Sequence, residues 1–296
     1  MSQSPASVSL QPIVLAACPL CGGSQARELA VYPELTWVRC DCSLIYKRSE
    51  QPDPAAAEFY ESGYFGAGDQ GRRYTQRTRR RIQKSRNQIL DLLNHVEPGP
   101  LLDIGCSVGY TLRAARELGL APTGSDLSQY AIQACRDQGF RAERGELSQL
   151  PFADGEFGLV TMKHVLEHTA EPRAALREVR RVLRPGGGVF IAIPHAGYRK
   201  AVAAPQASRY YLPSAHGREH FVYYTPQTLT RLLEQEGFRV VAVNPQLLHR
   251  RAGLLRRVGE CLLSPLRAIA QRLADGFQIR KEFWLVAVRT ETPSVS

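Results

Sequence analysis

The first 17 residues contain no lysine or arginine, so the positively charged start of an export signal is missing. This absence matters because Leu15-Ala16-Ala17-Cys18 has the small-residue pattern that precedes the modified cysteine of exported lipoproteins. No apolar run elsewhere in the chain approaches the roughly 20 residues needed to span a bilayer. The sequence therefore disfavours export and a transmembrane helix, and we expect a soluble, cytoplasmic protein.

Acidic residues are absent between Arg72 and Arg86, a segment with eight lysines and arginines. The segment from His249 to Glu282 has eight more basic residues against three acidic ones, and the rest of the chain has a slight acidic excess. The formal net charge of +10 therefore resides in these two segments. Either segment fits a solvated helix face, but two of them on a mildly acidic body favour an anionic partner.

Four cysteines near the start form two closely spaced pairs: Cys18 with Cys21, and Cys40 with Cys42. Structural zinc is usually held by four thiolate or imidazole ligands, and the distance between these pairs is usual for such sites. The second pair is Cys-x-Cys, which is tighter than the common Cys-x-x-Cys. Free thiols or two disulfides are the alternatives, but nothing in the sequence indicates the oxidising compartment that disulfides require. We expect a structural zinc ribbon.

The chain divides by composition into four parts. Residues 1–12 are predicted to be a disordered tail, 13–50 the zinc-ribbon module, 51–97 a connector and N-terminal helix, and 98–296 the main domain. In the main domain, segments with strand and helix patterns alternate, which predicts a doubly wound, mostly parallel sheet of the α/β class. Residues 171–187 are predicted to be a helix broken by Pro185-Gly186, followed by a strand.

The segment Asp103-Ile104-Gly105-Cys106-Ser107-Val108-Gly109 closes the first of these strands. Its glycines allow a ligand to approach the backbone, but their spacing does not match the Gly-x-Gly-x-x-Gly pattern of dinucleotide sites. Asp126, at the end of the next strand, can accept two hydrogen bonds from a ribose diol. The pattern indicates an adenosine-containing cofactor without a pyrophosphate, although both aspartates also fit simple turn or cap carboxylates.

Five segments in order, "LLDIGCSVG", "GSDLS", "GELSQLPFADGEF", "HVLEH" and "RVLRPGGGVFIAIP", resemble the class I S-adenosylmethionine-dependent methyltransferases. The early cysteines and the later "HFVYYTPQTLTRLLEQEGF" resemble a bacterial subset in which a zinc ribbon precedes the catalytic domain. The resemblance covers most of the chain. It implies a Rossmann-like fold whose sheet has seven strands, the last of them antiparallel.

The resemblance also implies which residues hold the cofactor, S-adenosylmethionine. Asp103 would hold the methionine amino group, Asp126 the ribose hydroxyls, and Glu146 would lie near the adenine amino group, where the family usually has Asp. The full set of cofactor-binding residues implied in this way is Asp103, Gly105, Cys106, Ser107, Gly109, Asp126, Leu127, Glu146, Leu147 and Lys163.

Transfer to a hydroxyl or an acidic carbon requires a base, and histidine suits that role at neutral pH. His164 follows the fourth strand of the domain, and His220 lies in the connection that would cap the site. For both, a catalytic and a structural role are left open. His195 and His216 are weaker candidates, and His168 fits a capping or packing role.

The motifs typical of amino-group and cytosine-ring methyltransferases are absent after the fourth strand, where Asn/Asp-Pro-Pro-Tyr/Phe or Pro-Cys would stand. We therefore expect an oxygen or carbon acceptor on a small molecule, a sugar or glycan, or a lipid-linked intermediate, with an anionic group or carrier. The alternative is an RNA methyltransferase that grips phosphates with its zinc ribbon and arginines. Nucleic acid is disfavoured because, apart from Tyr74, aromatic residues are not interleaved with the arginines of the first basic segment, and no recognised RNA-binding module is present. Residues 246–281 are predicted to be a basic amphipathic lid, with peripheral membrane contact as the alternative.

Overall fold

The computed structural model of the chain describes residues 15–32, 35–48, 78–196, 220–243 and 282–291. The predicted tail, most of the connector, His216 and the predicted lid at 246–281 lie outside these residues. The division into 13–50, 51–97 and 98–296 remains a prediction. Within the described residues, no helix is long and apolar enough to cross a membrane.

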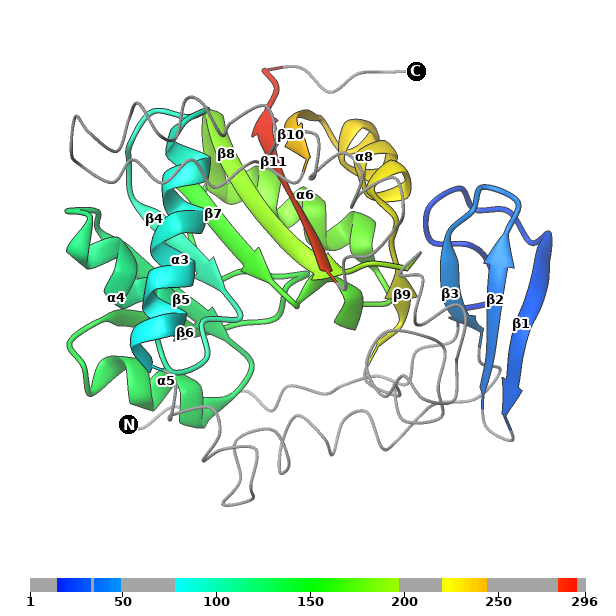
Figure 1. Cartoon of the computed structure of the whole chain (residues 1–296), viewed down its shortest axis with the longest axis horizontal. Coiled ribbons are helices and arrows are strands. Elements are labelled where there is room, and N and C mark those ends of the chain that lie inside the picture. Colours follow the sequence, from blue (N-terminus) through cyan, green and yellow to red (C-terminus); the bar gives the residue numbers. More distant parts are fainter. Residues whose placement is uncertain (1–14, 33–34, 49–77, 197–219, 244–281, 292–296) are drawn as a thin grey trace, which may run out of the picture.

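A seven-stranded sheet organises the main body of the protein (Figure 1). Its spatial order is β10-β11-β8-β7-β4-β5-β6. The strands are β4 (Leu101–Ile104), β5 (Pro122–Asp126), β6 (Arg141–Arg144), β7 (Phe157–Lys163), β8 (Leu183–Pro194), β10 (Phe238–Val243) and β11 (Glu282–Arg289). The pairs from β6 to β8 are parallel, whereas β11 is antiparallel to both neighbours. The predicted Rossmann-like α/β fold with an antiparallel last strand is confirmed.

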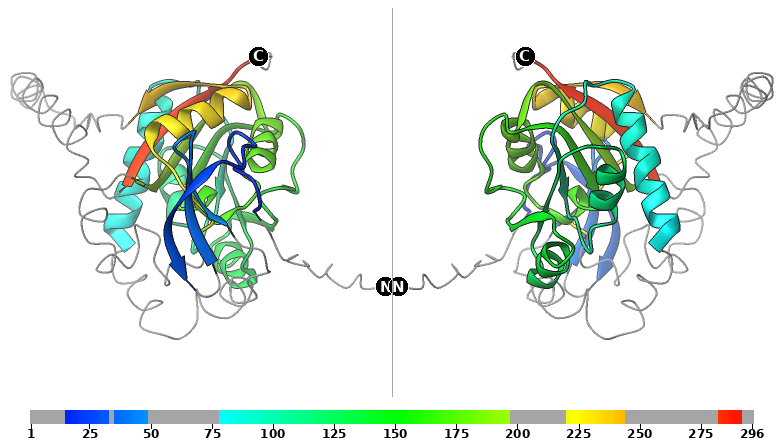
Figure 2. Two further views of the ribbon diagram at one scale, coloured as in Figure 1. Left: turned by 90° about the vertical axis from the view of Figure 1, so that its right-hand side faces the viewer. Right: turned by 90° about the vertical axis from the view of Figure 1, so that its left-hand side faces the viewer.

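Helices cover both faces of this sheet, as the two side views show (Figure 2). They are α3 (Thr78–Leu93), α4 (Tyr110–Glu117), α5 (Gln129–Arg136), α6 (Pro172–Val182) and α8 (Pro226–Gln235), with a short 3₁₀ turn, η2, at Leu166–His168. On β7, Leu159 packs in the cluster that contains α3 and α4, whereas Val160 packs in the cluster that contains α6 and α8. Because successive strand residues point to opposite faces, near-continuous apolar strands are what this two-sided burial requires.

Helix α6 ends before the break at Pro185-Gly186 that the sequence predicts. It stops at Val182, and Leu183 to Pro194 form β8, so Pro185 and Gly186 lie inside the strand. The pairing of β8 with β7 shifts in register here: Phe157 opposes Leu183 and Leu159 opposes Gly188. Gly186 has φ of +71°, which glycine adopts without strain. The predicted boundary, a helix broken at Pro185-Gly186 and then a strand, was wrong because residues 183–187 already form the irregular start of the strand.

A second, smaller sheet lies beside the main one (Figure 1). It has the order β1-β2-β3-β9, all antiparallel, with β1 (Ala26–Tyr32), β2 (Leu35–Cys40), β3 (Ile45–Arg48) and β9 (Val222–Tyr223). The outer strand β9 is far from the other three strands in the sequence. It pairs with β3, and Tyr223 lies opposite Ile45. Leu20, Val38 and Tyr46 share one apolar cluster with residues of the main body. The small sheet therefore packs against the main body and shares its apolar core.

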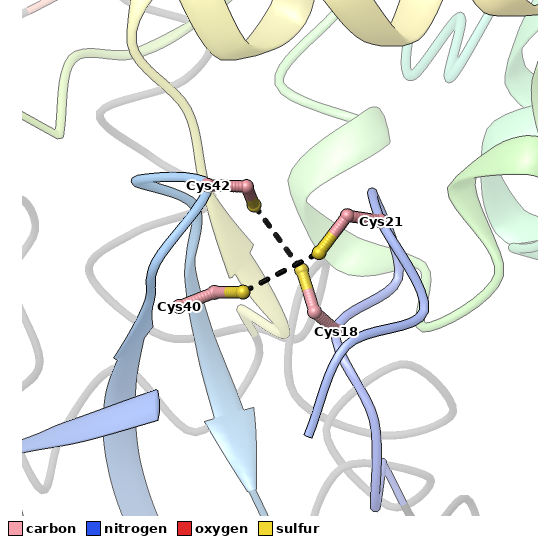
Figure 3. Close-up of side chains that lie close together, drawn as sticks. All are labelled: Cys18, Cys21, Cys40 and Cys42. Atoms are coloured by element: carbon pink, nitrogen blue, oxygen red, sulfur yellow. Dashed lines mark hydrogen bonds between the residues drawn. The ribbon is translucent and has the colours of Figure 1, made fainter. Parts of the chain in front are cut away.

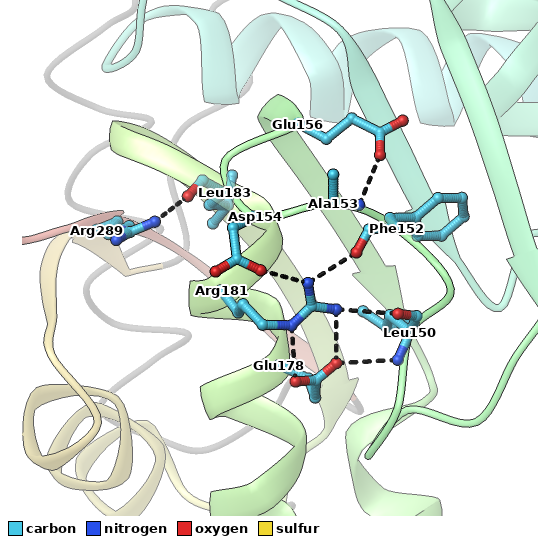
Figure 4. Close-up of polar contacts among 9 residues, drawn as sticks. All are labelled: Leu150, Phe152, Ala153, Asp154, Glu156, Glu178, Arg181, Leu183 and Arg289. Carbon is cyan, nitrogen blue, oxygen red and sulfur yellow. Dashed lines mark hydrogen bonds and ion pairs between the residues drawn. The ribbon is translucent and has the colours of Figure 1, made fainter.

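The segment after β6 is held against α6 by one guanidinium group (Figure 4). Arg181 donates two hydrogen bonds of 2.9 Å to Glu178, one of 2.7 Å to Asp154, and others to the carbonyls of Leu150 and Phe152 at 2.9 and 2.7 Å. Glu178 in turn accepts from the Leu150 backbone N–H at 3.0 Å. The hydrogen bonds from Arg181 hold the pKa of Glu178 below its usual range.

Replacing Arg181 with glutamine is expected to lower the free energy of unfolding by about 2–3 kcal/mol, because several hydrogen bonds to charged groups are lost together. Urea unfolding followed by circular dichroism would measure the change. Arg48→Gln is the matched control, since its exposed ion pair with Glu28 contributes little. Equal stability of the two variants would contradict a bracing role for Arg181.

Candidate functional site

The turn between β4 and α4 brings the backbone close to the edge of the sheet. Gly105 has φ of +71°, and a Cβ atom there would lie 2.4 Å from the Val165 side chain. Gly109 has φ of +82° and occupies the N-cap position of α4. Ser107 adopts φ of +51°, which is uncommon for a residue other than glycine. The tight turn therefore depends on glycine at position 105 for reasons of both conformation and space.

Asp126 ties this turn to the end of β5. One carboxylate oxygen accepts a hydrogen bond from the Ser107 backbone N–H at 2.9 Å, and the other accepts from the Ser128 N–H at 2.9 Å. Burial raises the pKa of Asp126, while these backbone bonds oppose the rise. Each oxygen retains a lone pair. Asp126 thus acts as a turn carboxylate and still has acceptors for a ribose diol.

Asp103 lies at the centre of a buried polar network. Its side chain is 1% exposed and accepts a 2.6 Å hydrogen bond from Thr161. Lys163, at the end of β7, donates to Ser85 of α3 at 3.0 Å and to Thr111 of α4. Burial raises the pKa of Asp103 and lowers that of Lys163, and each charge opposes the shift of the other. This network joins two strands to two helices at the end of the sheet where the strands finish.

The other predicted cofactor residues lie at the same edge, because β4 to β7 are parallel neighbours whose carboxyl ends coincide. Leu127 follows β5, and Glu146 and Leu147 follow β6. Cys106 is buried in the turn, with its sulfur 3.8 Å from that of Cys135. All ten predicted cofactor residues thus belong to four neighbouring strand ends.

Two buried hydroxyl oxygens at this edge, those of Ser107 and Ser125, have no hydrogen-bond partner within the described part of the chain. Buried polar atoms are normally satisfied, so an unpartnered pair beside a glycine turn fits a site that receives a polar ligand. With the ribose acceptors of Asp126 and the charged network of Asp103, the residues present fit S-adenosylmethionine.

His164 stands directly after β7 with φ of +54°. Its Nδ1 lies 3.2 Å from Glu167 and its Nε2 lies 3.1 Å from Glu282, which also pairs with Lys84 at 2.7 Å. Burial opposes protonation, but the two carboxylates prevail and raise the pKa of His164 to about 9. The side chain is 41% exposed.

His220 occupies a different environment. It is 8% exposed, its Nδ1 lies 3.2 Å from the Tyr223 hydroxyl, and its ring packs edge-on against His168 at 4.6 Å between centroids. Burial lowers its pKa to about 3. His195 packs against Phe283, with ring centroids 5.3 Å apart. Glu167, which is 1% exposed, pairs with His164 and has a carboxylate oxygen within 4.8 Å of a ring nitrogen of His220.

The four predicted metal ligands converge (Figure 3). The sulfurs of Cys18 and Cys42 are 3.5 Å apart, those of Cys21 and Cys40 are 3.4 Å apart, and all four lie within 4.8 Å of one another. These separations exceed the roughly 2.05 Å of a disulfide and are close to the roughly 3.8 Å of thiolates around tetrahedral zinc. The cysteine cluster is therefore a candidate metal site in the small sheet.

Backbone hydrogen bonds connect the small sheet with the segments that carry the histidines. The Lys47 N–H of β3 donates to the Phe221 carbonyl at 2.8 Å, and the Phe221 N–H donates to the Glu167 carbonyl at 2.8 Å. His220 is the residue next to Phe221. The small sheet therefore fixes the backbone on which His220 and Glu167 lie.

Sequence reasoning missed the partners of the histidines. Glu167 lies three residues after His164, a spacing that places two side chains near one another in a helical turn. Glu282 begins the last strand, and Tyr223 lies in the unexpected strand β9; no local pattern indicates either contact.

The family of the chain is shown by comparison with known proteins. A family model described as "Methyltransferase domain" matches residues 74–243, more than half of the chain. The match spans the glycine turn, Asp126 and the histidine cluster. The chain belongs to this family, and its domain is a class I S-adenosylmethionine-dependent methyltransferase domain.

The individual proteins that the chain resembles share a third or less of their aligned residues with it. An uncharacterised protein of Mycobacterium tuberculosis is 33% identical over 186 residues, which cover 62% of this chain and 61% of the relative. A ubiquinone biosynthesis O-methyltransferase of Bordetella avium is 26% identical over 173 residues, covering 53% of this chain and 71% of that protein. The chain thus spans about three fifths of the length of the mycobacterial relative.

Two solved structures share the fold. A chain from the complex of the Haloferax volcanii Trm112 methyltransferase activator with a methyltransferase superposes with a TM-score of 0.51 at 17% identity, covering 74% of this chain and 96% of that one. The PH0226 protein of Pyrococcus horikoshii gives 0.51 at 17% identity, covering 73% and 92%. At this identity the likeness concerns the fold alone.

Proposed function

We propose that this protein transfers the methyl group of S-adenosylmethionine to an oxygen or carbon atom of a small molecule, a sugar or glycan, or a lipid-linked intermediate. The observation that carries the proposal is the position of His164, an exposed imidazole directly after the strand that ends in Lys163. The distant similarity to ubiquinone O-methyltransferases supports an oxygen acceptor. An anionic group or carrier on the acceptor would match the basic segments, and a membrane-bound carrier would need peripheral contact.

The cofactor supplies an electrophilic methyl group, so the protein chiefly aligns the acceptor and excludes water. Asp126 would accept hydrogen bonds from the ribose, Asp103 would face the methionine ammonium group, and Glu146 and the two leucines would contact the adenine. Gly105, Cys106, Ser107 and Gly109 would line the amino-acid half, with Lys163 held between Ser85 and Thr111.

His164 is our candidate for the base. The carboxylate of Glu167 orients its ring through Nδ1, as carboxylates orient the histidine of other acid–base pairs. At neutral pH this raised pKa keeps His164 protonated; an acceptor that replaces Glu282 at Nε2 would remove one of the two carboxylates that raise the pKa, so that the neutral ring could receive the acceptor proton there. His220, the other candidate, is almost fully buried and so less accessible to an acceptor.

We also propose that Cys18, Cys21, Cys40 and Cys42 hold one zinc ion with a structural role. Four thiolates complete a tetrahedron and leave no position for water or substrate. Two of the sulfur-bearing residues, Cys18 and Cys40, are 2% and 3% exposed, which suits a site that braces a small sheet.

The test is the transfer of labelled methyl groups from S-adenosylmethionine to a cell extract divided into RNA, lipid and glycan, and small-molecule fractions. We expect label outside the RNA fraction, and we expect His164→Gln to bind cofactor normally while transferring at least 10-fold more slowly. Asp126→Ala, which is expected to bind the cofactor weakly, is the control and should transfer much less label. Nuclease-sensitive label in RNA would overturn the acceptor class, and full activity of His164→Gln would overturn the base.

A further inference from the structure

Glu167, His168 and His220 form a second group of side chains with the donor atoms of a metal site. One donor atom from each residue lies within 4.8 Å of the others. Glu167 and His168 come from the turn η2, while His220 comes from the segment just before β9. The backbone bond between Phe221 and Glu167 holds the two segments together. The group shares no residue with the four cysteines.

The two oxygens of the Glu167 carboxylate have different surroundings. Its Oε1 pairs with His164 Nδ1 at 3.2 Å, whereas Oε2 is buried and has no hydrogen-bond partner among the residues that the structure describes. A carboxylate that is 1% exposed normally has both oxygens satisfied. An unpartnered, charged oxygen beside two imidazoles is explained by a cation.

The ring of His220 is oriented in the same manner. The 3.2 Å contact of its Nδ1 with the Tyr223 hydroxyl leaves Nε2 as the nitrogen available to a ligand. Histidines that bind metals typically use the other ring nitrogen for such a hydrogen bond, which fixes the tautomer and the ring orientation. Two of the three ligands therefore have the outer partners that a metal site requires.

We propose that Glu167, His168 and His220 bind a divalent transition-metal ion. Two imidazoles and one carboxylate are a ligand set that suits Zn²⁺, Mn²⁺ or Fe²⁺, and they differ from the all-sulfur set of the cysteine cluster. Three protein ligands leave at least one coordination position open to water or another oxygen donor. Bound there, the ion would join η2 to the segment before β9.

The test counts metal ions on the full-length protein after dialysis against Zn²⁺ and removal of unbound metal, by plasma mass spectrometry. We expect two zinc ions per chain in the wild type and one in Glu167→Gln, whose amide keeps an oxygen for His164 but presents a poor ligand in place of Oε2. His168→Gln is also expected to bind one. The matched control is His95→Gln, an exposed histidine outside the group, which should retain two.

The number of zinc ions that each variant loses tests whether there are two separate metal sites. Cys42→Ser should lose one ion and Cys42→Ser with His168→Gln should lose both. Identical zinc content of the wild type, Glu167→Gln and His168→Gln would overturn the proposal. Should Glu167→Gln fail to fold by near-ultraviolet circular dichroism, the half-buried His168 provides the deciding variant. No S-adenosylmethionine or acceptor is present, so a failure here leaves the proposed methyl transfer untouched.

Discussion

Replacing Asp126 with alanine is expected to weaken the binding of S-adenosylmethionine by about 30- to 150-fold, or about 2–3 kcal/mol. The variant removes the carboxylate that would accept the ribose hydroxyls, and such charge-assisted hydrogen bonds are the stronger kind. It also leaves the Ser107 and Ser128 N–H groups without their acceptor, so the glycine turn loses its connection to β5. Both effects act on the cofactor side of the site.

Titration calorimetry with S-adenosylhomocysteine, the stable product, would measure the loss. Asp137→Ala is the matched control, because Asp137 is exposed at the end of α5 and its carboxylate accepts a hydrogen bond from Gln133, one turn before it. Near-ultraviolet circular dichroism would verify that both variants are folded. An affinity of Asp126→Ala within twofold of the wild type would show that the carboxylate is only a turn cap.

Replacing Cys42 with serine is expected to remove the metal from the cysteine cluster and to lower the free energy of unfolding by at least about 3 kcal/mol. Cys42 is only half-buried, so the change from sulfur to oxygen costs little packing. The loss would come from the metal, since a neutral hydroxyl is a poor replacement for a thiolate around zinc.

Zinc content and thermal unfolding of the purified chain would measure both effects. Cys261→Ser supplies a control in which a cysteine is lost while the four-cysteine cluster stays complete. A Cys42→Ser protein that unfolds at the wild-type temperature would argue that packing alone stabilises the small sheet. Retention of the full zinc content would instead exclude Cys42 as a ligand.

The sequence predicted the sheet of the main domain well because its signals are local. Apolar strands that end in Gly or Asp, and helices with a cap such as Thr225, are fixed by neighbours within a few residues. The four cysteines were found for the same reason, since two short spacings identify them. Asp103 follows an apolar run, and Asp126 ends the next predicted strand, so both stand where parallel strands place their ligands.

Contacts between distant segments could not be predicted. Glu282 reaches His164 only because β11 lies antiparallel to β8, and the order of strands in a sheet is not encoded in any one strand. Strand β9 has two residues and no periodicity to detect. The premature end of α6 was missed because Arg180, Arg181 and Arg184 continue a helical pattern into a segment whose backbone joins the sheet.

The pairing of Ile45 with Tyr223 affects how the small sheet can form while the chain is being synthesised on the ribosome. Synthesis proceeds from the N-terminus, and the four cysteines emerge long before the strand that completes their sheet. Contacts between segments so far apart in sequence form slowly, because a long loop must close first. A fragment that ends before residue 222 therefore lacks the edge strand that pairs with β3.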